Sequence, residues 1–194
     1  MQIGKLIHIP NKRHRLHEFS GISFNSKKCK NGDAFFAIKG NKNNGNNFIN
    51  DAITKGAKLI ISNKKYQGYK KDILYLKNNN PRKLLSKFAS TIYNKKPKNI
   101  IAVTGTNGKS SIANFYFQIL NLCKKKATSI GTLGVNSSNY NFPLPNTTLD
   151  PISLNKLLEE EKKNKINNVI LEASSHGLKQ HRLDGLKFNI GIFT

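Results

Sequence analysis

The chain has 194 residues, of which 37% are hydrophobic, so it can form one ordinary domain or two small ones with a buried core, and wholesale disorder is excluded. No apolar run approaches the roughly 18 residues of a membrane span, and the N-terminus lacks the features of a signal peptide. The two cysteines, Cys29 and Cys123, form no metal or redox spacing. We therefore expect a cytoplasmic protein without a membrane partner.

The formal charge of +23 suggests a nucleic-acid partner, but the kinds of basic residue argue against one. Only four arginines occur, although arginine is the preferred side chain for bidentate contacts with phosphates and bases. The lysines are scattered through a background rich in asparagine and isoleucine, residue types that share A/T-rich codons. We therefore expect the lysines to lie on solvated surface and predict no nucleic-acid partner.

Strand-like and helix-like segments alternate in the first part of the chain. Short apolar runs at residues 33–38 and 57–62 predict strands, because turn residues bound them. Residues 48–55 have apolar positions at helical spacing, and Gly56 after them is a common helix-stop signal. Pro81 predicts the start of another helix, whose buried face should contain Leu84, Leu85, Phe88, Ala89 and Ile92.

The second part of the chain follows a linker and has the pattern of a parallel sheet. Residues 99–104 form a continuous apolar run, and a glycine-rich turn and a helix come after it. The inward face of this helix is predicted to contain Ile112, Phe115, Tyr116, Ile119 and Leu120. Further elements are predicted as strands at 127–130, 168–173 and 188–194 and an amphipathic helix at 152–163. This alternation predicts an α/β fold, and a final core strand without a covering helix suggests an incomplete domain.

The strongest motif is Thr104-Gly105-Thr106-Asn107-Gly108-Lys109-Ser110-Ser111, between the predicted buried strand and the helix. Glycines let backbone N–H groups surround an anion, and the helix N-terminus adds its positive end. In a phosphate loop Lys109 would reach the β- and γ-phosphates of a nucleotide, and Ser110 would bind Mg²⁺. The general pattern has glycine where this chain has Val103. A plain glycine turn with a surface lysine is the alternative.

A second group of polar residues, from Glu172 to His176, follows the predicted strand at 168–173. In an open parallel sheet, ligands bind beyond the carboxyl ends of the strands, where the phosphate loop also lies. Glu172 could therefore hold Mg²⁺ with its hard oxygen ligands, and His176 could assist a second metal. A capping or paired carboxylate and an ordinary loop histidine are the alternatives.

Three motifs in order resemble the Mur ligase family. The loop from Thr104 to Ser110 is similar to the phosphate-loop variant of Mur ligases and their folylpolyglutamate synthetase relatives. Residues 172–182, together with Asn146-Thr147-Thr148, resemble the signature of the UDP-N-acetylmuramoyl-tripeptide synthetases. Residues 25–27 and 31–40 are similar to that family's uridine-binding domain. The resemblance covers the chain from about residue 19 to residue 194.

The resemblance implies a small N-terminal α/β uridine-binding domain at residues 1–97 and the first part of a parallel-sheet, phosphate-loop central domain at residues 98–194. It implies an ATP- and Mg²⁺-dependent ligase of peptidoglycan precursor synthesis. Such an enzyme adds meso-diaminopimelate, or otherwise lysine, to UDP-N-acetylmuramoyl-L-alanyl-D-glutamate through an acyl phosphate. The family's carbamylated lysine and C-terminal amino-acid-binding domain would lie beyond residue 194. The 194 residues alone are therefore expected to be inactive, and we expect a monomer.

The resemblance also implies roles for individual residues. ATP would be bound by Gly105, Thr106, Asn107, Gly108, Lys109, Ser110 and Ser111, with Lys109, Glu172 and His176 as catalytic residues and Ser110, Glu172 and His176 at the metals. The UDP-linked dipeptide would be bound by Phe24, Ser26, Asn41, Lys42, Asn43, Asn146, Thr147, Thr148, Ser174, Gln180 and Arg182. The family usually has Asp-Ser-Arg at residues 25–27, and many relatives have aspartate at Asn44. Another ligase of the superfamily, or a basic phosphate-loop protein that binds nucleic acid, is the alternative.

Overall fold

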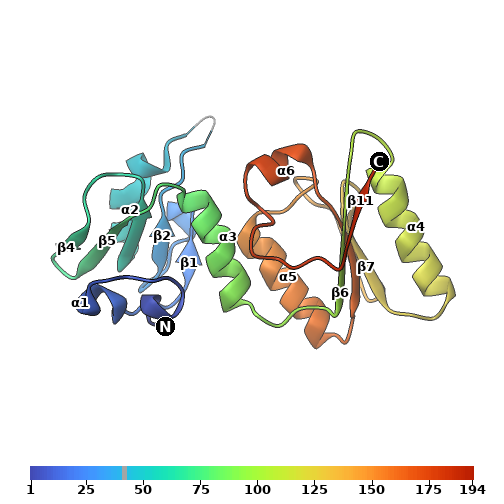
Figure 1. The fold of residues 1–194 in the computed structure, drawn as a ribbon, viewed down its shortest axis with the longest axis horizontal. Helices are drawn as coiled ribbons and strands as arrows, with labels where there is room; N and C mark the ends of the chain where they lie inside the picture. Colours follow the sequence, from blue (N-terminus) through green and yellow to red (C-terminus); the bar gives the residue numbers. More distant parts are fainter. Residues whose placement is uncertain (41–42) are drawn as a thin grey trace. The chain divides into compact units, whose positions relative to one another are not determined.

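The structure, a computed structural model, describes residues 1–40 and 43–194, and Figure 1 shows the course of the chain. These residues form two compact units, Met1–Phe88 and Ala89–Thr194, so the first unit ends within a helix. The predicted domain boundary, between residues 97 and 98, lies a few residues further along the chain and stays a prediction.

The first unit contains a five-stranded sheet in the order β1-β2-β3-β5-β4. All neighbours pair in parallel except β4 and β5, which are antiparallel. The strands are β1 (Ile22–Ser23), β2 (Ala34–Phe36), β3 (Leu59–Ser62), β4 (Gly68–Lys70) and β5 (Ile73–Lys77). The helices are η1 (Ile3–Lys5), α1 (Lys12–Arg15), η2 (Ser26–Lys28), η3 (Gly45–Phe48), α2 (Ile49–Thr54) and α3 (Pro81–Ile92), the last of which continues into the second unit.

The predicted elements of the first unit are confirmed, with shorter strands. Helix α2 ends just before Gly56, whose φ of +95° is a left-handed conformation that favours glycine. Helix α3 begins at Pro81 and buries its predicted apolar face, although Ile92 is only half-buried. Its Phe88 ring lies 5.3 Å from Phe36 and 6.2 Å from Phe19, so aromatic packing fixes the helix in the core of this unit.

The second unit contains a six-stranded sheet in the order β11-β6-β10-β7-β8-β9. The first four strands in this order are parallel, and β8 and β9 are added by antiparallel pairing. The strands are β6 (Asn99–Thr104), β7 (Ala127–Gly131), β8 (Gly134–Ser137), β9 (Asn141–Phe142), β10 (Asn168–Glu172) and β11 (Ile190–Phe193). The helices of this unit besides the end of α3 are α4 (Lys109–Leu122), α5 (Pro151–Lys163) and α6 (Ser175–Lys179).

Helices α4 and α5 cover opposite faces of this sheet (Figure 1). Side chains alternate between the faces, so Ile100 and Val169 pack with α5, and Ile101 and Ile170 pack with α4. Helix α5 begins at the residue after Asp150, whose carboxylate accepts hydrogen bonds from two backbone N–H groups of the first turn. The central strands β6, β10 and β7 are therefore covered on both faces, as their continuous apolar sequences predict.

Two sequence predictions for this unit are wrong, the first of them only in part. On α4, the predicted Ile112 and Tyr116 do pack against the sheet beside the buried Ala113. Phe115 and Ile119, however, are 59% and 57% exposed. This helix has apolar residues on both sides, so their periodicity does not reveal which side packs, and the small Ala113 allows a close approach. Strand β11 pairs with β6 at the edge of the sheet and is largely exposed rather than a core strand.

Within residues 1–40 and 43–194, no helix has both the length and the apolar character that a membrane crossing requires.

Candidate active site

The phosphate-loop motif forms the turn between β6 and α4. Gly105 and Gly108 have φ angles of +138° and +80°, which side-chain-bearing residues rarely adopt. A Cβ atom at Gly105 would also overlap the carbonyl oxygen of Thr194. Between the two glycines, Thr106 and Asn107 are exposed, and the 14-residue helix α4 begins directly after the turn. The turn therefore presents a helix N-terminus to solvent, as an anion site requires.

The Lys109 ammonium lies over this loop. Its Nζ atom donates hydrogen bonds to the carbonyl oxygens of Gly105 at 2.8 Å and Thr106 at 3.0 Å. Ser110 is half-buried and Ser111 is exposed in the same helical turn. The positive charge and the helix N-terminus thus act at one place, and both favour a phosphate group there.

Thr194 holds the loop from the neighbouring strand, a contact that the sequence analysis missed. Its backbone N–H donates to the Thr104 carbonyl at 2.9 Å, and its own carbonyl accepts from the Thr106 N–H at 3.3 Å. Its hydroxyl donates to the carbonyl oxygens of Thr104 and Asn107. Strand pairing between β11 and β6 brings Thr194 to the loop, and no local motif marks it.

Glu172 ends β10 as a buried carboxylate, with 2% of the residue exposed. It pairs in register with Val103 of β6, just before the loop, and the alternation of side chains places it on the α4 face with Ile170. Its two oxygens accept hydrogen bonds from Thr132, one from the backbone N–H at 2.9 Å and one from the hydroxyl at 3.1 Å. The carboxylate is thereby held in one orientation.

Gly131 and Thr132 are therefore functional candidates that the sequence analysis did not identify. A Cβ atom at Gly131 would overlap the Glu172 carboxylate, so only glycine leaves room for it. The Thr132 hydroxyl also lies 3.1 Å from the Thr147 hydroxyl, which links Glu172 to the predicted substrate residues. The available signal was the position of Gly131 at the end of β7 and of Thr132 directly after it, because such strand ends meet at one edge of a parallel sheet.

Four of the predicted dipeptide-binding residues form one hydrogen-bonded cluster at this edge. The buried Thr148 hydroxyl donates to the Glu172 carbonyl at 2.9 Å and accepts from the Ser174 N–H at 3.0 Å. The Arg182 guanidinium donates to the Gln180 side-chain oxygen at 2.8 and 3.1 Å and to the Thr148 carbonyl. The structure thus brings together residues up to 34 positions apart. Of the remaining predicted pair in this unit, Thr147 contacts Thr132 and Asn146 is exposed.

His176 lies on the exposed first turn of α6, which Ser174 caps by accepting from the Gly177 N–H at 3.1 Å. Its Nε2 atom is 2.6 Å from the side-chain nitrogen of Gln180. Within the described ranges, no group of three or more His, Cys, Asp or Glu side chains could hold a metal ion. Mg²⁺ bound to a nucleotide needs only one or two protein carboxylates besides phosphate and water. Glu172 therefore fits the role of a ligand to nucleotide-bound Mg²⁺, rather than a member of a metal site made of protein side chains alone.

The predicted uridine residues of the first unit surround short turns. Ser26 is buried in η2, and Phe24 before it is 40% exposed. Asn25 caps η2 by accepting from the Lys27 N–H at 3.0 Å. Asn43 is exposed, and its carbonyl accepts from Gly40 at 2.8 Å, whereas Asn41 and Lys42 lie outside the described residues.

Asn44 is the second departure from the family pattern, and it still acts as a cap. Its side-chain oxygen accepts from the Asn46 backbone N–H at 3.1 Å at the start of η3. An amide oxygen and a carboxylate oxygen both serve as N-caps, so the amide loses a charge but keeps this hydrogen bond.

A glycine turn with a lysine leads into a helix, and the neighbouring strand ends in a buried carboxylate. These features define an α/β protein of the phosphate-loop class. The family model of the Mur ligase middle domain matches residues 103–194, and that of the Mur ligase family catalytic domain matches residues 18–93. The chain belongs to the Mur ligase family.

Known proteins support this assignment. The UDP-N-acetylmuramoyl-L-alanyl-D-glutamate–2,6-diaminopimelate ligase of Rickettsia montanensis is 45% identical over 182 residues, which is 92% of this chain and 38% of that protein. A solved structure of a ligase with the same name has a TM-score of 0.80 at 27% identity, covering 100% of this chain and 40% of that one. The fold also occurs in the MurF ligase of Thermotoga maritima in complex with ADP, at 21% identity and a TM-score of 0.53, covering 79% of this chain and 32% of that one. The chain spans about 38% of the length of the curated relatives it matches.

Proposed function

We propose that the 194 residues supply the uridine-nucleotide-binding and ATP-binding parts of a ligase that adds the third amino acid to UDP-N-acetylmuramoyl-L-alanyl-D-glutamate. One observation supports this proposal most strongly. The loop before Lys109, the carboxylate of Glu172 and the Thr148–Arg182 cluster all lie at the carboxyl ends of neighbouring parallel strands, at one edge of the sheet. The names of the relatives supply the substrate, with diaminopimelate as the added amino acid and lysine as the alternative. Residues 1–97 would form the first domain and residues 98–194 the second.

The proposed reaction has two steps. The terminal carboxylate of the UDP-linked dipeptide takes the γ-phosphoryl group of ATP, which gives an acyl phosphate and ADP. The amine of the incoming amino acid then attacks the acyl carbon, and the C–O bond to phosphate breaks as the amide forms. A carboxylate is a poor electrophile and needs this activation, so the protein chiefly has to gather anionic groups and offset their charge.

In this proposal the loop residues Gly105–Ser111 bind the ATP phosphates through backbone N–H groups and the Lys109 ammonium. Ser110 and Glu172 would hold Mg²⁺, with His176 near a second metal, and the bound ion would offset negative charge on the phosphate oxygens. Thr132 keeps the Glu172 carboxylate oriented through two hydrogen bonds. Each carboxylate oxygen retains a further lone pair for a cation.

Several residues would bind the UDP-linked dipeptide. Arg182 is suited to an anionic group of this substrate, because its planar guanidinium has five N–H donors and makes three hydrogen bonds to the described residues. Phe24, Ser26, Asn41, Lys42 and Asn43 would contact the uridine diphosphate end. The muramoyl-dipeptide end would contact Asn146, Thr147, Thr148, Ser174 and Gln180. We place the reaction in the cytoplasm and propose a monomer.

Equilibrium binding tests the proposal without requiring turnover. Titration calorimetry should show binding of Mg·ATP and of UDP-N-acetylmuramoyl-L-alanyl-D-glutamate, and each ligand should raise the melting temperature because it binds only the folded chain. The variant Lys109→Met should lose Mg·ATP binding, whereas Lys125→Met, an exposed lysine between α4 and β7, should not. Binding of polynucleotide that falls steeply with salt, without binding of the UDP-linked dipeptide, would instead support the nucleic-acid alternative.

A further inference from the structure

The second unit contains a cavity of about 330 Å³ that is separate from the candidate active site. Residues of α3, the linker and the segment before β11 line it, among them Lys98 and Asn189, which directly precede β6 and β11. The cavity therefore lies at the amino ends of these two strands, whereas the phosphate loop follows the carboxyl end of β6. Six residues of strand separate the two ends, about 20 Å at the usual rise per residue.

Three lysines, Lys96, Lys98 and Lys187, line this cavity. Lys96 is half-buried, and its ammonium donates to the Tyr93 carbonyl oxygen. No carboxylate in the described part of the chain forms an ion pair with any of the three. Glu159 acts on Lys96 electrostatically, but its ion pair is with Lys163 at 3.2 Å. Burial lowers the pKa of Lys96 from 10.5 to about 8, although the negative charge of Glu159 opposes this shift.

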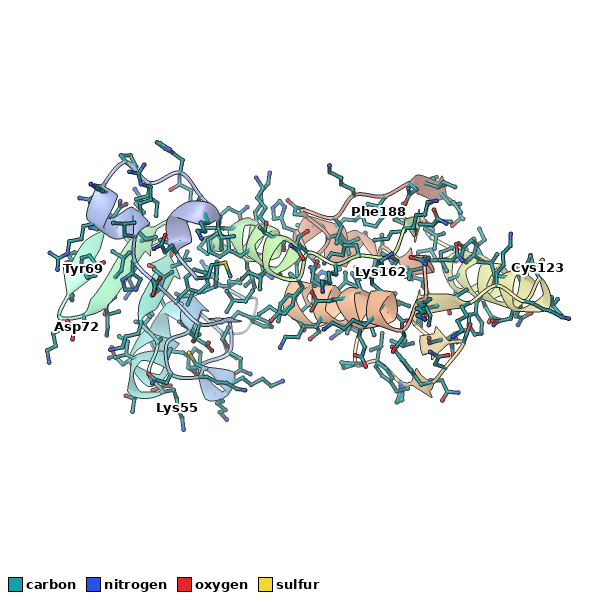
Figure 2. The ribbon with its side chains drawn as sticks, turned by 90° about the horizontal axis from the view of Figure 1, so that it is seen from below. Lys55, Tyr69, Asp72, Cys123, Lys162 and Phe188 are labelled. Carbon is teal, nitrogen blue, oxygen red and sulfur yellow. The ribbon has the colours of Figure 1, made fainter. Side chains whose placement is uncertain are left out.

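Part of the cavity wall is apolar, and the rest of it is polar. Pro97 and Ile100 are buried, and Leu186 and Phe188 are half-buried against the core cluster around α5. Phe188 is labelled in Figure 2, on the segment that leads into β11. Pockets of this size that combine an apolar wall with a few charged groups are the usual form of a small-ligand site.

We propose that this cavity is a second anion site, which binds a small organic phosphate with its phosphate group on the lysines and its organic body against Ile100 and Phe188. The proposal is independent of the ligase function, because none of these residues belongs to the phosphate loop or to the substrate cluster. An anion here would give Lys96 the ion pair that it does not form within the described part of the chain. A ligand with an apolar body would bind more tightly than inorganic phosphate, because it also removes apolar wall surface from water.

Phenyl phosphate is the probe, and inorganic phosphate and phenol are its comparators. We expect calorimetry to show binding of phenyl phosphate that is tighter than that of either comparator. Lys96→Met should weaken it about tenfold, the effect of losing one charge-assisted hydrogen bond. The exposed-lysine control Lys125→Met should leave it unchanged, and Lys109→Met should retain it because the phosphate loop is a different site. Lys187→Met serves as a second cavity variant if Lys96→Met does not fold.

Three results would overturn the proposal. Loss of phenyl phosphate binding in Lys109→Met, with retention in the cavity variants, would assign the anion to the phosphate loop alone. An equal loss in Lys125→Met and the cavity variants would show general charge attraction rather than a site. Binding no tighter than that of inorganic phosphate would remove the role of the apolar wall. A chemical-shift change confined to residues 94–98 and 185–189 on titration would support it.

Discussion

The hydroxyl of Thr132 should stabilise the protein by holding the buried carboxylate of Glu172. Thr132→Val keeps the size and branching of the side chain and the backbone N–H bond to Glu172, but removes the hydrogen bond at 3.1 Å to the second oxygen. A hydrogen bond to a charged group contributes about 1.5–3 kcal/mol, and the unpaired oxygen stays in a residue that is 2% exposed. We therefore expect a loss of unfolding free energy in this range.

Urea unfolding monitored by circular dichroism measures this loss. With an m-value of about 1–3 kcal/mol per molar urea, the midpoint should fall by roughly 1 M, whereas Thr132→Ser, which keeps the hydroxyl, should remain close to the parent. A double-mutant cycle with Glu172→Gln isolates the interaction between the two residues. A Thr132→Val variant within about 0.5 kcal/mol of the parent, or a cycle without coupling, would refute the proposed orientation of Glu172.

Three further perturbations have defined outcomes. Gly105→Ala should destabilise the chain by about 1–3 kcal/mol in urea and abolish Mg·ATP binding, because φ is +138° and the new Cβ would overlap Thr194. The pKa of Lys96 is lowered from 10.5 to about 8, so the unfolded state binds more protons than the folded state between these two pH values. The unfolding free energy of the parent, relative to that of Lys96→Met, should therefore rise from pH 8 to pH 10.5. A difference that does not change with pH would contradict this. Iodoacetamide at pH 8 should modify Cys123, which is exposed at the end of α4 (Figure 2). Cys29 should react only after unfolding, because burial raises its pKa to about 11. Mass spectrometry of the modified peptides distinguishes the two cysteines.

Local signals in the sequence determined most of the secondary structure. Continuous apolar runs predicted β3, β6 and β10, and Pro81 and Gly56 marked helix ends, because proline and glycine act on the backbone of their own residues. The phosphate-loop motif was readable for the same reason, since its glycines, lysine and helix N-terminus are adjacent in the chain. Three motifs in order were also enough to indicate the Mur ligase family.

Tertiary structure decided which side chains meet. Thr132 orients Glu172 across 40 residues, and Thr194 closes the loop that begins 90 residues earlier, because parallel strands bring their carboxyl ends together whatever their separation in the chain. The buried side of α4 was only partly readable, since Phe115 is as apolar as the residues that pack, and only the position of the helix on the sheet selected Ala113. Periodicity shows that a helix has apolar sides, but the partner surface decides which of them is buried.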